Sequence, residues 1–208
     1  MTRVKFCGIT NLEDAELCAG HGAWALGMIF VPSSPRRCKQ GEAARIVGAL
    51  QRKVELVGVF QNATLDHVVH TAESLRLTMV QLHGDEGPSY ADEVHRRTGA
   101  KVIKAVRIAS RADVARLQPF RTDFHLLDGA GGTTFEWSLV REHRSDVPII
   151  TAGGLTPENV GDAIRATEPY AVDVASGIEV MGSHPPHKDP AKVAAFAAAA
   201  AAAGAQVA

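Results

Sequence analysis

The sequence predicts a single-domain α/β protein, a (β/α)8 barrel in which eight parallel strands alternate with eight helices. Two observations carry this prediction. Short apolar runs alternate with amphipathic segments from one end of the 208 residues to the other, which is typical of parallel α/β folds. These units number eight, or roughly 26 residues each, slightly shorter than the units of a usual ~250-residue barrel. We therefore expect residues 1–208 to form one barrel domain.

The strands are expected where the runs are apolar throughout, as in strands buried on both faces. In order they are 4–6, 25–30, 56–60, 79–82, 102–106, 124–127, 148–151 and 171–174. A doubly wound open sheet is the alternative. Eight units favour closure, and no G-x-G-x-x-G follows the first strand, which argues against a Rossmann domain.

Amphipathic stretches between the strands predict the helices. They cover 12–19, 42–50, 65–74, 89–97, 112–117, 137–143, 157–166 and 190–203. Thr10 and Glu13 have the spacing of a capping box at the first helix. Thr156 and Asp189 each precede a proline, as an N-cap residue does before a proline at the first helical position. Gly204 is expected to end the last, alanine-rich helix.

Composition excludes several classes of protein. Lys plus Arg is 22 and Asp plus Glu is 23, so no basic excess favours a nucleic-acid partner. No apolar run approaches the ~18 residues of a membrane span, and the start of the chain has no signal-peptide pattern. The three cysteines, Cys7, Cys18 and Cys38, lack metal-site spacing. We expect a cytoplasmic protein with reduced thiols.

Cys7 and Asp128 are the candidate chemical groups. Each follows an apolar run and precedes a glycine, which places it at the C-terminal end of a strand, where barrels keep their chemistry. A thiol and a carboxyl in such places are a candidate base and acid. The alternatives are a small buried hydrophobic residue for Cys7 and a helix cap or turn residue for Asp128.

Two glycine turns follow the seventh and eighth strands. The first contains Gly153 and Gly154, and the second contains Ser176 and Gly177. Barrels often bind phosphate at this place through backbone N–H groups and a helix N-terminus. Glycine lets the backbone approach the phosphate oxygens without a Cβ in the way. Two ordinary tight turns are the alternative interpretation.

The chain resembles the phosphoribosylanthranilate isomerase family. Matching stretches occur in order along nearly the whole chain, and three are specific in combination: KFCGIT at 5–10, QLHGDE at 81–86 and GGLTPEN at 153–159. Further matches lie at 34–36, 57–60, 131–133, 135–139 and 172–179.

The resemblance implies a TIM-barrel isomerase of tryptophan biosynthesis. Its reaction is an Amadori rearrangement of N-(5-phospho-β-D-ribosyl)anthranilate to 1-(2-carboxyphenylamino)-1-deoxy-D-ribulose 5-phosphate. The first-strand cysteine of the family pattern is the base and the sixth-strand aspartate is the acid, so these roles pass to Cys7 and Asp128. No metal and no organic cofactor is implied.

This chemistry sets conditions on both groups. A free thiol has a pKa of roughly 8.5, so a lowered pKa would help Cys7 to act as a base. Lys5 and Arg36 are the cationic residues that could lower the pKa of Cys7. For Lys5 the alternative is a side chain that points away from the site. Asp128 has to carry a proton in order to donate one.

Three further residues are expected to bind the substrate. Arg36 follows the second strand, and its guanidinium suits the anthranilate carboxylate; a solvated loop arginine is the alternative. Asp173 ends the eighth strand and is expected to face the amine or the sugar ring. His83 follows the fourth strand and is expected to be a hydrogen-bonding residue of the barrel mouth.

The chain departs from the family pattern at three places. The stretch after the acid, 131–137, is two residues shorter than usual, which bears on closure of the site. Ala175 stands where a serine is common. The segment 181–187 is longer and contains two histidines, for which a surface loop is expected rather than a metal site.

Several rival functions remain. A pentose-phosphate epimerase would need metal-binding histidines at strand ends, and indole-glycerol-phosphate synthase would need a catalytic lysine with its own glutamates. A non-catalytic phosphate-binding or regulatory barrel is favoured by the shortened loop and disfavoured by Cys7, Asp128 and Arg36. The expected partner is a small phosphosugar, with no nucleic acid and no membrane, and the chain is expected to be a monomer or a homodimer.

Overall fold

Eight parallel strands close into a barrel within residues 2–129 and 132–206, which are the residues that the computed structural model describes. Each strand pairs with its neighbours in the sequence, and β1 pairs with β8 to complete the circle. The strands are β1 (Arg3–Cys7), β2 (Ala25–Ile29), β3 (Glu55–Phe60), β4 (Met79–Leu82), β5 (Lys101–Ile108), β6 (Phe124–Gly129), β7 (Ile149–Thr151) and β8 (Ala171–Val174). The predicted (β/α)8 fold is confirmed.

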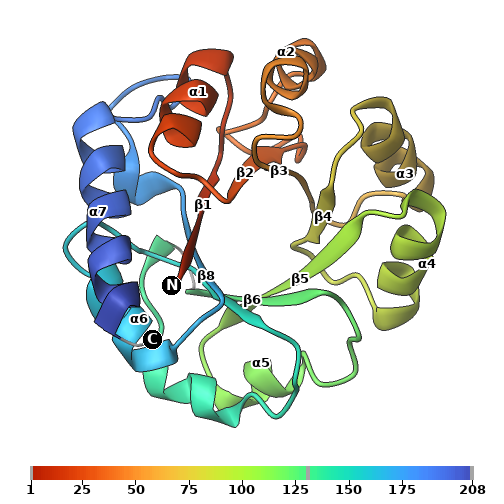
Figure 1. Ribbon diagram of the computed structural model, residues 1–208. Coiled ribbons are helices and arrows are strands. Elements are labelled where there is room, and N and C mark those ends of the chain that lie inside the picture. Colours follow the sequence, from red (N-terminus) through yellow and green to blue (C-terminus); the bar gives the residue numbers. More distant parts are fainter. Residues whose placement is uncertain (1, 130–131, 207–208) are drawn as a thin grey trace.

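The helices form a ring around the strands (Figure 1). They are α1 (Leu12–Gly20), α2 (Gln40–Leu50), α3 (Leu65–Ser74), α4 (Pro88–Thr98), α5 (Arg111–Ala115), α6 (Val160–Thr167) and α7 (Pro190–Gln206). Two 3-10 helices, η2 (Trp137–Glu142) and η3 (Ser176–Ile178), complete the set described here. Their apolar faces pack on the outside of the barrel, because each strand is buried on both sides.

Alternate side chains of the strands fill the barrel interior, as expected for this fold. The inner cluster of buried apolar residues includes Val57, Met79, Ile103, Leu126 and Ile150. Near the N-terminal ends of the strands, the rings of Trp24, Phe124 and Tyr170 contact one another with centroids 5.0 to 5.5 Å apart. These rings close that end, so the interior is open to a ligand only at the other.

The predicted capping box at Thr10 is wrong. The N-cap of α1 is Asn11, whose Oδ1 accepts a hydrogen bond from the backbone N–H of Asp14 at 2.8 Å. The Thr10 hydroxyl instead donates to the carbonyl oxygen of Pro186 at 3.4 Å. Threonine and asparagine are both good N-cap residues, so a contact distant in the sequence decides between the two neighbours.

Thr156 makes the predicted capping contact, because its Oγ1 accepts from the N–H of Glu158 at 3.3 Å, but the helix begins later than expected. A turn precedes the helix, and α6 begins only at Val160. The Asn159 side chain accepts from the N–H of Thr156 at 2.8 Å and donates to the carbonyl oxygen of Gly154 at 3.0 Å. The segment is therefore tied back to the glycine turn after β7, which delays the helix.

Helix α7 begins at Pro190 as predicted, but it does not end at Gly204. Oδ1 of Asp189 accepts from the N–H groups of Ala191 and Lys192 at 2.9 and 3.2 Å. The helix continues past Gly204 to Gln206. A Cβ at Gly204 would lie 2.8 Å from the backbone nitrogen of Thr2, so glycine here allows packing against the start of the chain.

Two segments differ from the predicted α-helices, one in length and the other in type of helix. Helix α5 covers five residues rather than 112–117, and the stretch 137–143 forms the 3-10 helix η2. No residue of η2 is fully buried. Trp137, Leu139 and Val140 are only partly buried against the core, so this short segment gains less of the packing that stabilises most α-helices.

Candidate active site

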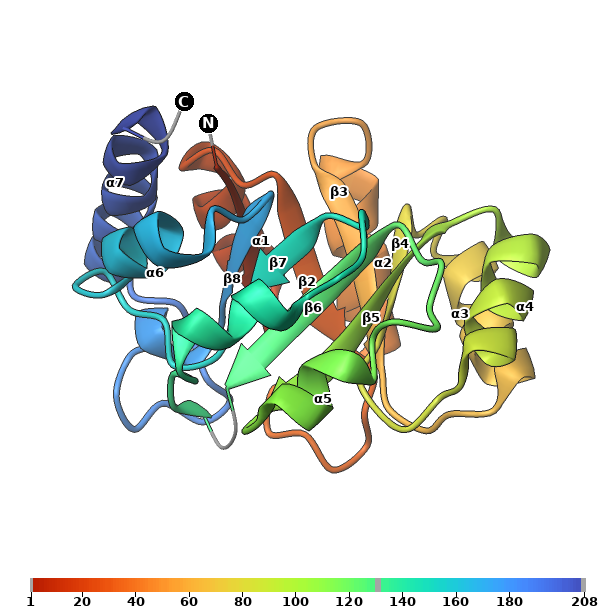
Figure 2. The same ribbon diagram turned by 90° about the horizontal axis from the view of Figure 1, so that it is seen from below.

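A cavity opens at the C-terminal ends of the strands, the face on which barrel enzymes build their active sites. Figure 2 shows the barrel from the side, with the start of β1 and the end of α7 at the opposite face. Eight of the nine residues that the sequence singled out line this cavity: Cys7, Arg36, His83, Asp128, Gly153, Gly154, Asp173 and Ser176. The ninth, Gly177, lies beside it.

Cys7 ends β1 and is 6% exposed. Its Sγ lies against β2 at Gly27, where an added Cβ would be 2.7 Å from the sulfur. Burial raises the pKa of the Cys7 thiol above its ordinary value, while the neighbouring Lys5 opposes this rise. The lowered pKa that would help Cys7 to act as a base is thus not found here, because the cost of burying a thiolate outweighs the nearby cation.

Lys5 points into the barrel, one layer below Cys7. Its Nζ donates to Oδ1 of Asp173 at 2.9 Å, and both side chains are buried. Burial alone would lower the pKa of the Lys5 ammonium, but Asp173 and Cys7 together raise it. A charged pair is thus fixed beneath the thiol, and Asp173 holds Lys5 as well as lining the cavity.

Asp128 is held by an imidazole across the barrel mouth. Nε2 of His83 lies 3.2 Å from Oδ2 of Asp128, and the two side chains are 24% and 22% exposed. The other ring nitrogen, Nδ1, lies 3.1 Å from Nε2 of Gln81. Gln81 is buried, and its Oε1 has no hydrogen-bond partner among the described residues, a situation that typically costs about 1–3 kcal/mol.

The two glycine turns lie against each other and against the end of β6. A Cβ at Gly153 would be 2.0 Å from the backbone nitrogen of Gly129 and 3.0 Å from Oδ1 of Asp128. A Cβ at Gly177 would be 1.9 Å from the carbonyl oxygen of Leu155. Gly177 therefore joins the turn after β8 to the turn after β7, while Gly154 and Ser176 face the cavity.

Arg36 is held in place by a carboxylate. Its Nε and Nη2 donate to the two carboxylate oxygens of Glu179 at 2.7 Å each. Lys188, which is buried, donates to the same carboxylate at 3.1 Å. The aliphatic part of Arg36 crosses Gly8, where a Cβ would be 2.7 Å from Cδ. The bidentate pair leaves the Nη1 side of the guanidinium for a ligand.

Two residues of the site, Gln81 and Glu179, escaped the sequence reasoning. Gln81 is a polar residue inside an otherwise apolar strand, two positions before His83, as Lys5 is two positions before Cys7. In a strand, residues i and i+2 face the same side, so this spacing was an available signal. No sequence signal marks Glu179, because its partner Arg36 is 143 residues away.

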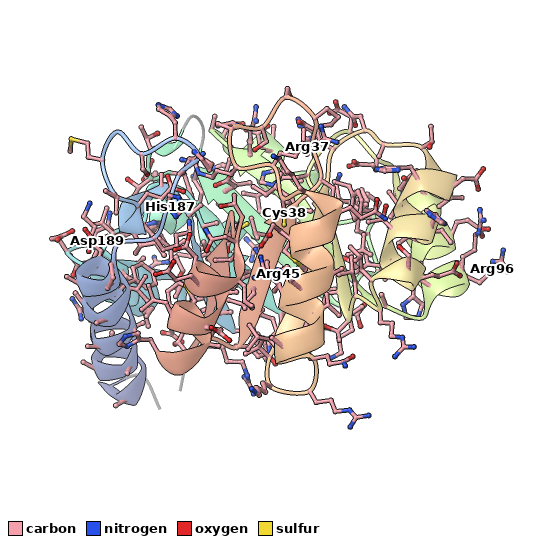
Figure 3. All side chains as sticks on the ribbon, turned by 90° about the horizontal axis from the view of Figure 1, so that it is seen from above. Arg37, Cys38, Arg45, Arg96, His187 and Asp189 are labelled. Carbon is pink, nitrogen blue, oxygen red and sulfur yellow. The ribbon has the colours of Figure 1, made fainter. Side chains whose placement is uncertain are left out.

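Two loops in which the chain departs from the family pattern are the stretch after Asp128 and the segment that contains His187. Part of the shortened stretch after Asp128, residues 130–131, lies outside the described residues. His187 lies at the surface by the start of α1 (Figure 3), with Nδ1 3.7 Å from Oδ2 of Asp14. Among residues 2–129 and 132–206, no three His, Cys, Asp or Glu side chains gather as metal ligands.

None of the helices within residues 2–129 and 132–206 has both the length and the apolar sequence that crossing a bilayer demands.

The fold and the site define a class of protein. A thiol, a carboxyl and an imidazole surround one cavity at the mouth of the barrel, beside two glycine turns and an arginine. This is a barrel enzyme whose side chains suit proton transfer on a small anionic substrate.

Comparisons with known proteins identify the family. Residues 4–199 match the family model described as N-(5'phosphoribosyl)anthranilate (PRA) isomerase. The N-(5'-phosphoribosyl)anthranilate isomerase of Geotalea uraniireducens is 45% identical over 203 residues, which are 94% of this chain and 97% of the relative. The chain therefore belongs to the N-(5'-phosphoribosyl)anthranilate isomerase family, and it is an isomerase of tryptophan biosynthesis.

Solved structures agree with this assignment. A structure of monomers made from the dimeric enzyme of Thermotoga maritima is 37% identical, with a TM-score of 0.84, and covers 97% of this chain and 100% of that one. A phosphoribosyl anthranilate isomerase in complex with reduced 1-(o-carboxyphenylamino)-1-deoxyribulose 5-phosphate is 36% identical, with a TM-score of 0.85, over 97% and 100% of the two chains.

Proposed function

We propose that this isomerase rearranges N-(5-phospho-β-D-ribosyl)anthranilate to 1-(2-carboxyphenylamino)-1-deoxy-D-ribulose 5-phosphate, with Asp128 as the acid and Cys7 as the base. Residues 1–208 act as a single catalytic domain. The observation that carries the proposal is that both side chains line one cavity, from β1 and β6. The bound ligand of the related structure supports a phosphosugar as the substrate.

The reaction needs two proton transfers. Asp128 gives its proton to the furanose ring oxygen, the C1–O bond breaks with its electron pair going to oxygen, and the amine nitrogen forms a Schiff base. The Cys7 thiolate then removes the C2 proton, and the electrons of the C–H bond neutralise the Schiff base to an enolamine. The enolamine tautomerises to the ketone product.

The thiolate is the less favoured state of Cys7 in the unliganded site, because burial raises the pKa of its thiol. Lys5 and Lys188 oppose that rise, so they favour the charged state that the reaction uses. A thiolate at Cys7 together with a proton on Asp128 has the same proton count as a thiol together with a carboxylate. The site therefore reaches its active form without exchanging a net proton with water.

The remaining residues bind the two charged ends of the substrate. The turns that contain Gly153, Gly154 and Ser176 are proposed to hold the phosphate through backbone N–H groups, with Gly177 supporting them from behind. Arg36, aimed by Glu179, is proposed to bind the anthranilate carboxylate. Asp173 and His83 complete the wall of the cavity around the ring.

The setting of the protein is part of the proposal. The three described cysteines are free, which suits the reducing cytoplasm. We expect no nucleic-acid partner, because the net charge is near zero, and we expect a monomer or a homodimer.

Substitution of the two proposed groups tests the roles. We expect Cys7→Ser to keep the fold and to reduce turnover about 10²-fold or more, the range of a positioned acid or base. Loss of the fluorescence of phosphoribosylanthranilate measures turnover, and circular dichroism checks the fold. A folded Cys7→Ser enzyme with near-normal turnover would remove Cys7 from the mechanism.

Asp128→Asn preserves shape and removes the proton, whereas Asp128→Ala removes both. We expect both variants to lose most turnover, with Asn no more than about tenfold better than Ala, or roughly 1.4 kcal/mol in barrier. Wild-type turnover in Asp128→Asn would make the aspartate a positioning residue, and Asp173 would be the next acid to test.

A further inference from the structure

The imidazole of His83 bridges a buried amide and the proposed acid. Gln81 lies in β4 and His83 follows that strand, so their side chains face the barrel interior together. Nε2 of Gln81 is 3.1 Å from Nδ1 of His83, and Nε2 of His83 is 3.2 Å from Oδ2 of Asp128. A neutral imidazole has one N–H and one acceptor nitrogen. The partner of Nδ1 therefore decides what Nε2 can offer to Asp128.

The orientation of the Gln81 amide fixes this choice. In the structure its NH₂ group faces Nδ1, so Nδ1 accepts, the ring N–H is on Nε2, and Asp128 accepts the hydrogen bond from it, most strongly as a carboxylate. With the amide turned by 180°, Oε1 would accept a hydrogen bond from Nδ1–H. Nε2 would then be an acceptor, and only a protonated Asp128 could satisfy it.

Nothing else among the described residues holds the amide in one orientation. Oε1 of Gln81 is buried without a hydrogen-bond partner there, so turning the amide breaks only its bond to His83, which forms again with the roles reversed. The imidazole, by contrast, cannot slide away, because both of its nitrogens have a partner.

We propose that Gln81 is a positioning residue for the acid: the orientation of its amide selects the tautomer of His83, and with it whether Asp128 faces an N–H donor, as in the structure, or a lone pair that favours its protonated form before ring opening. This inference rests on the proposed role of Asp128. Donation of the Asp128 proton to the ring oxygen leaves a carboxylate facing the Nε2 lone pair. The unfavourable contact is relieved when Asp128 regains a proton.

Other charged groups around Asp128 also bear on its protonation. They come from every neighbouring element: Cys7 on β1, Arg36 after β2, Asp173 on β8 and, on β5, Arg107, which is the register partner of Asp128. Within the part of the chain that the structure describes, His83 is the one of these groups that lies within ion-pair distance of the Asp128 carboxylate. The imidazole is thus the contact through which the amide can act.

Two substitutions of Gln81 separate the proposal from a structural role. Gln81→Met fills similar space but offers neither donor nor acceptor, so it leaves both tautomers of His83 populated. Gln81→Glu offers only acceptors in its ionised form, so it holds the proton on Nδ1, as the proposal requires for the acid state. Gln51→Met, at the exposed C-cap of α2, is the matched control for the chemical change alone.

The experiment combines kinetics with ¹⁵N NMR of histidine-labelled full-length protein, because the ¹⁵N shifts of a ring distinguish its protonated nitrogen. We expect Gln81→Met to lower kcat about tenfold or more, a part of the 10²- to 10⁴-fold contribution of a positioned acid. KM should change less than threefold, and the two nitrogens of His83 should lose their distinct shifts. Gln81→Glu should recover most of kcat, with the proton on Nδ1.

The outcomes are distinguishable from failure of the acid assignment. A tautomer of His83 that is the same in wild type and in Gln81→Met overturns the inference, whatever the rates. The inference is also overturned if the tautomer of His83 changes with the substitution at position 81 while kcat stays at the wild-type value. A folded Gln81→Glu enzyme no faster than Gln81→Met also contradicts it. Turnover by Asp128→Asn separately tests the role of Asp128.

Discussion

Cys7 reaches the cavity beside a glycine of the neighbouring strand, and the same device recurs around the site. Gly27 makes room for the sulfur, Gly8 for the stem of Arg36, and Gly153 for the end of β6 at Asp128. In each case a Cβ would lie 2.0 to 2.7 Å from the nearest atom. Since packed interiors do not yield to an added methyl group without strain, these glycines fix where the functional groups stand.

Gly27→Ala tests this at the residue scale. The added Cβ would be 2.7 Å from Sγ and 3.3 Å from Cα of Cys7, so both the side chain and its backbone have to move. We expect kcat to fall about tenfold or more, because a base must stay within hydrogen-bond reach of its proton. We expect a loss of about 1–3 kcal/mol in unfolding free energy, as for overpacking. Steady-state kinetics and urea unfolding measure the two effects.

Gly48→Ala is the matched control. Gly48 is exposed on α2 and has no atom within 4 Å of an added Cβ. We expect unchanged kcat and a gain of roughly 0.5–1 kcal/mol, because alanine favours the helix. A Gly27→Ala enzyme with wild-type kcat would show that the position of the sulfur is not critical.

At the scale of elements, repeating apolar patterns predicted the strands well, whereas the single residues at which helices begin were harder to predict. The eight strands follow from apolar runs of three to six residues, a signal that several residues share. Helix starts depend on one or two residues. The capping role of Asp189 was predictable, because an aspartate directly before a proline is typical of a helix N-cap followed by the first helical residue. Thr10 was misassigned, because its partner Pro186 belongs to the tertiary structure. The helix after Thr156 begins later than predicted, because Asn159 bonds back to Gly154.

Asp189→Ala tests the start of α7, which Figure 3 shows at the same end of the molecule as His187. The carboxylate accepts from two backbone N–H groups, and alanine leaves both without that acceptor. We expect the unfolding free energy to fall by about 1 kcal/mol, within the 0.5–2 kcal/mol range for N-caps. Asp189→Ser retains an acceptor and should stay close to wild type in the same urea titration. Equal losses in both variants would contradict a capping role.

At the scale of the whole molecule, the fold was predictable and the side-chain pairings of the site were only partly so. Closure of the barrel brings together residues far apart in the sequence: Lys5 and Asp173 are 168 positions apart, and Arg36 and Glu179 are 143 apart. Strand ends were enough to predict that Cys7 and Asp128 share the mouth. No periodicity reveals that Glu179 holds Arg36, or that burial raises the pKa of the Cys7 thiol.

The same limit applies to a histidine pair between β6 and η2, whose effect extends to the stability of the whole molecule. His125 is fully buried, and its Nδ1 is 2.8 Å from Nε2 of His143. Burial, together with the like charge that a protonated His143 would carry, lowers the pKa of His125 to about 4. The unfolded chain has the ordinary pKa of about 6.5.

The sign of the pH dependence follows from proton binding. Between pH 6.5 and 4 the unfolded state binds the proton of residue 125 and the folded state does not, so the unfolding free energy falls as the pH falls. The contribution of His125 is fully present above pH 6.5 and lost toward pH 4. From pH 7.5 to pH 5 the loss is about 2 kcal/mol, at 1.36 kcal/mol per pKa unit.

His125→Asn is the variant that isolates this effect, because an amide can occupy the place of Nδ1 without titrating in this range. We expect wild type to lose about 2 kcal/mol more than His125→Asn between pH 7.5 and pH 5 in urea unfolding. Carboxylates such as Glu179, whose pKa Arg36 and Lys188 lower against the opposing effect of burial, are present in both proteins and cancel in the difference. Parallel pH profiles in the two proteins would show that His125 titrates normally, and the buried pair would then have no part in acid sensitivity.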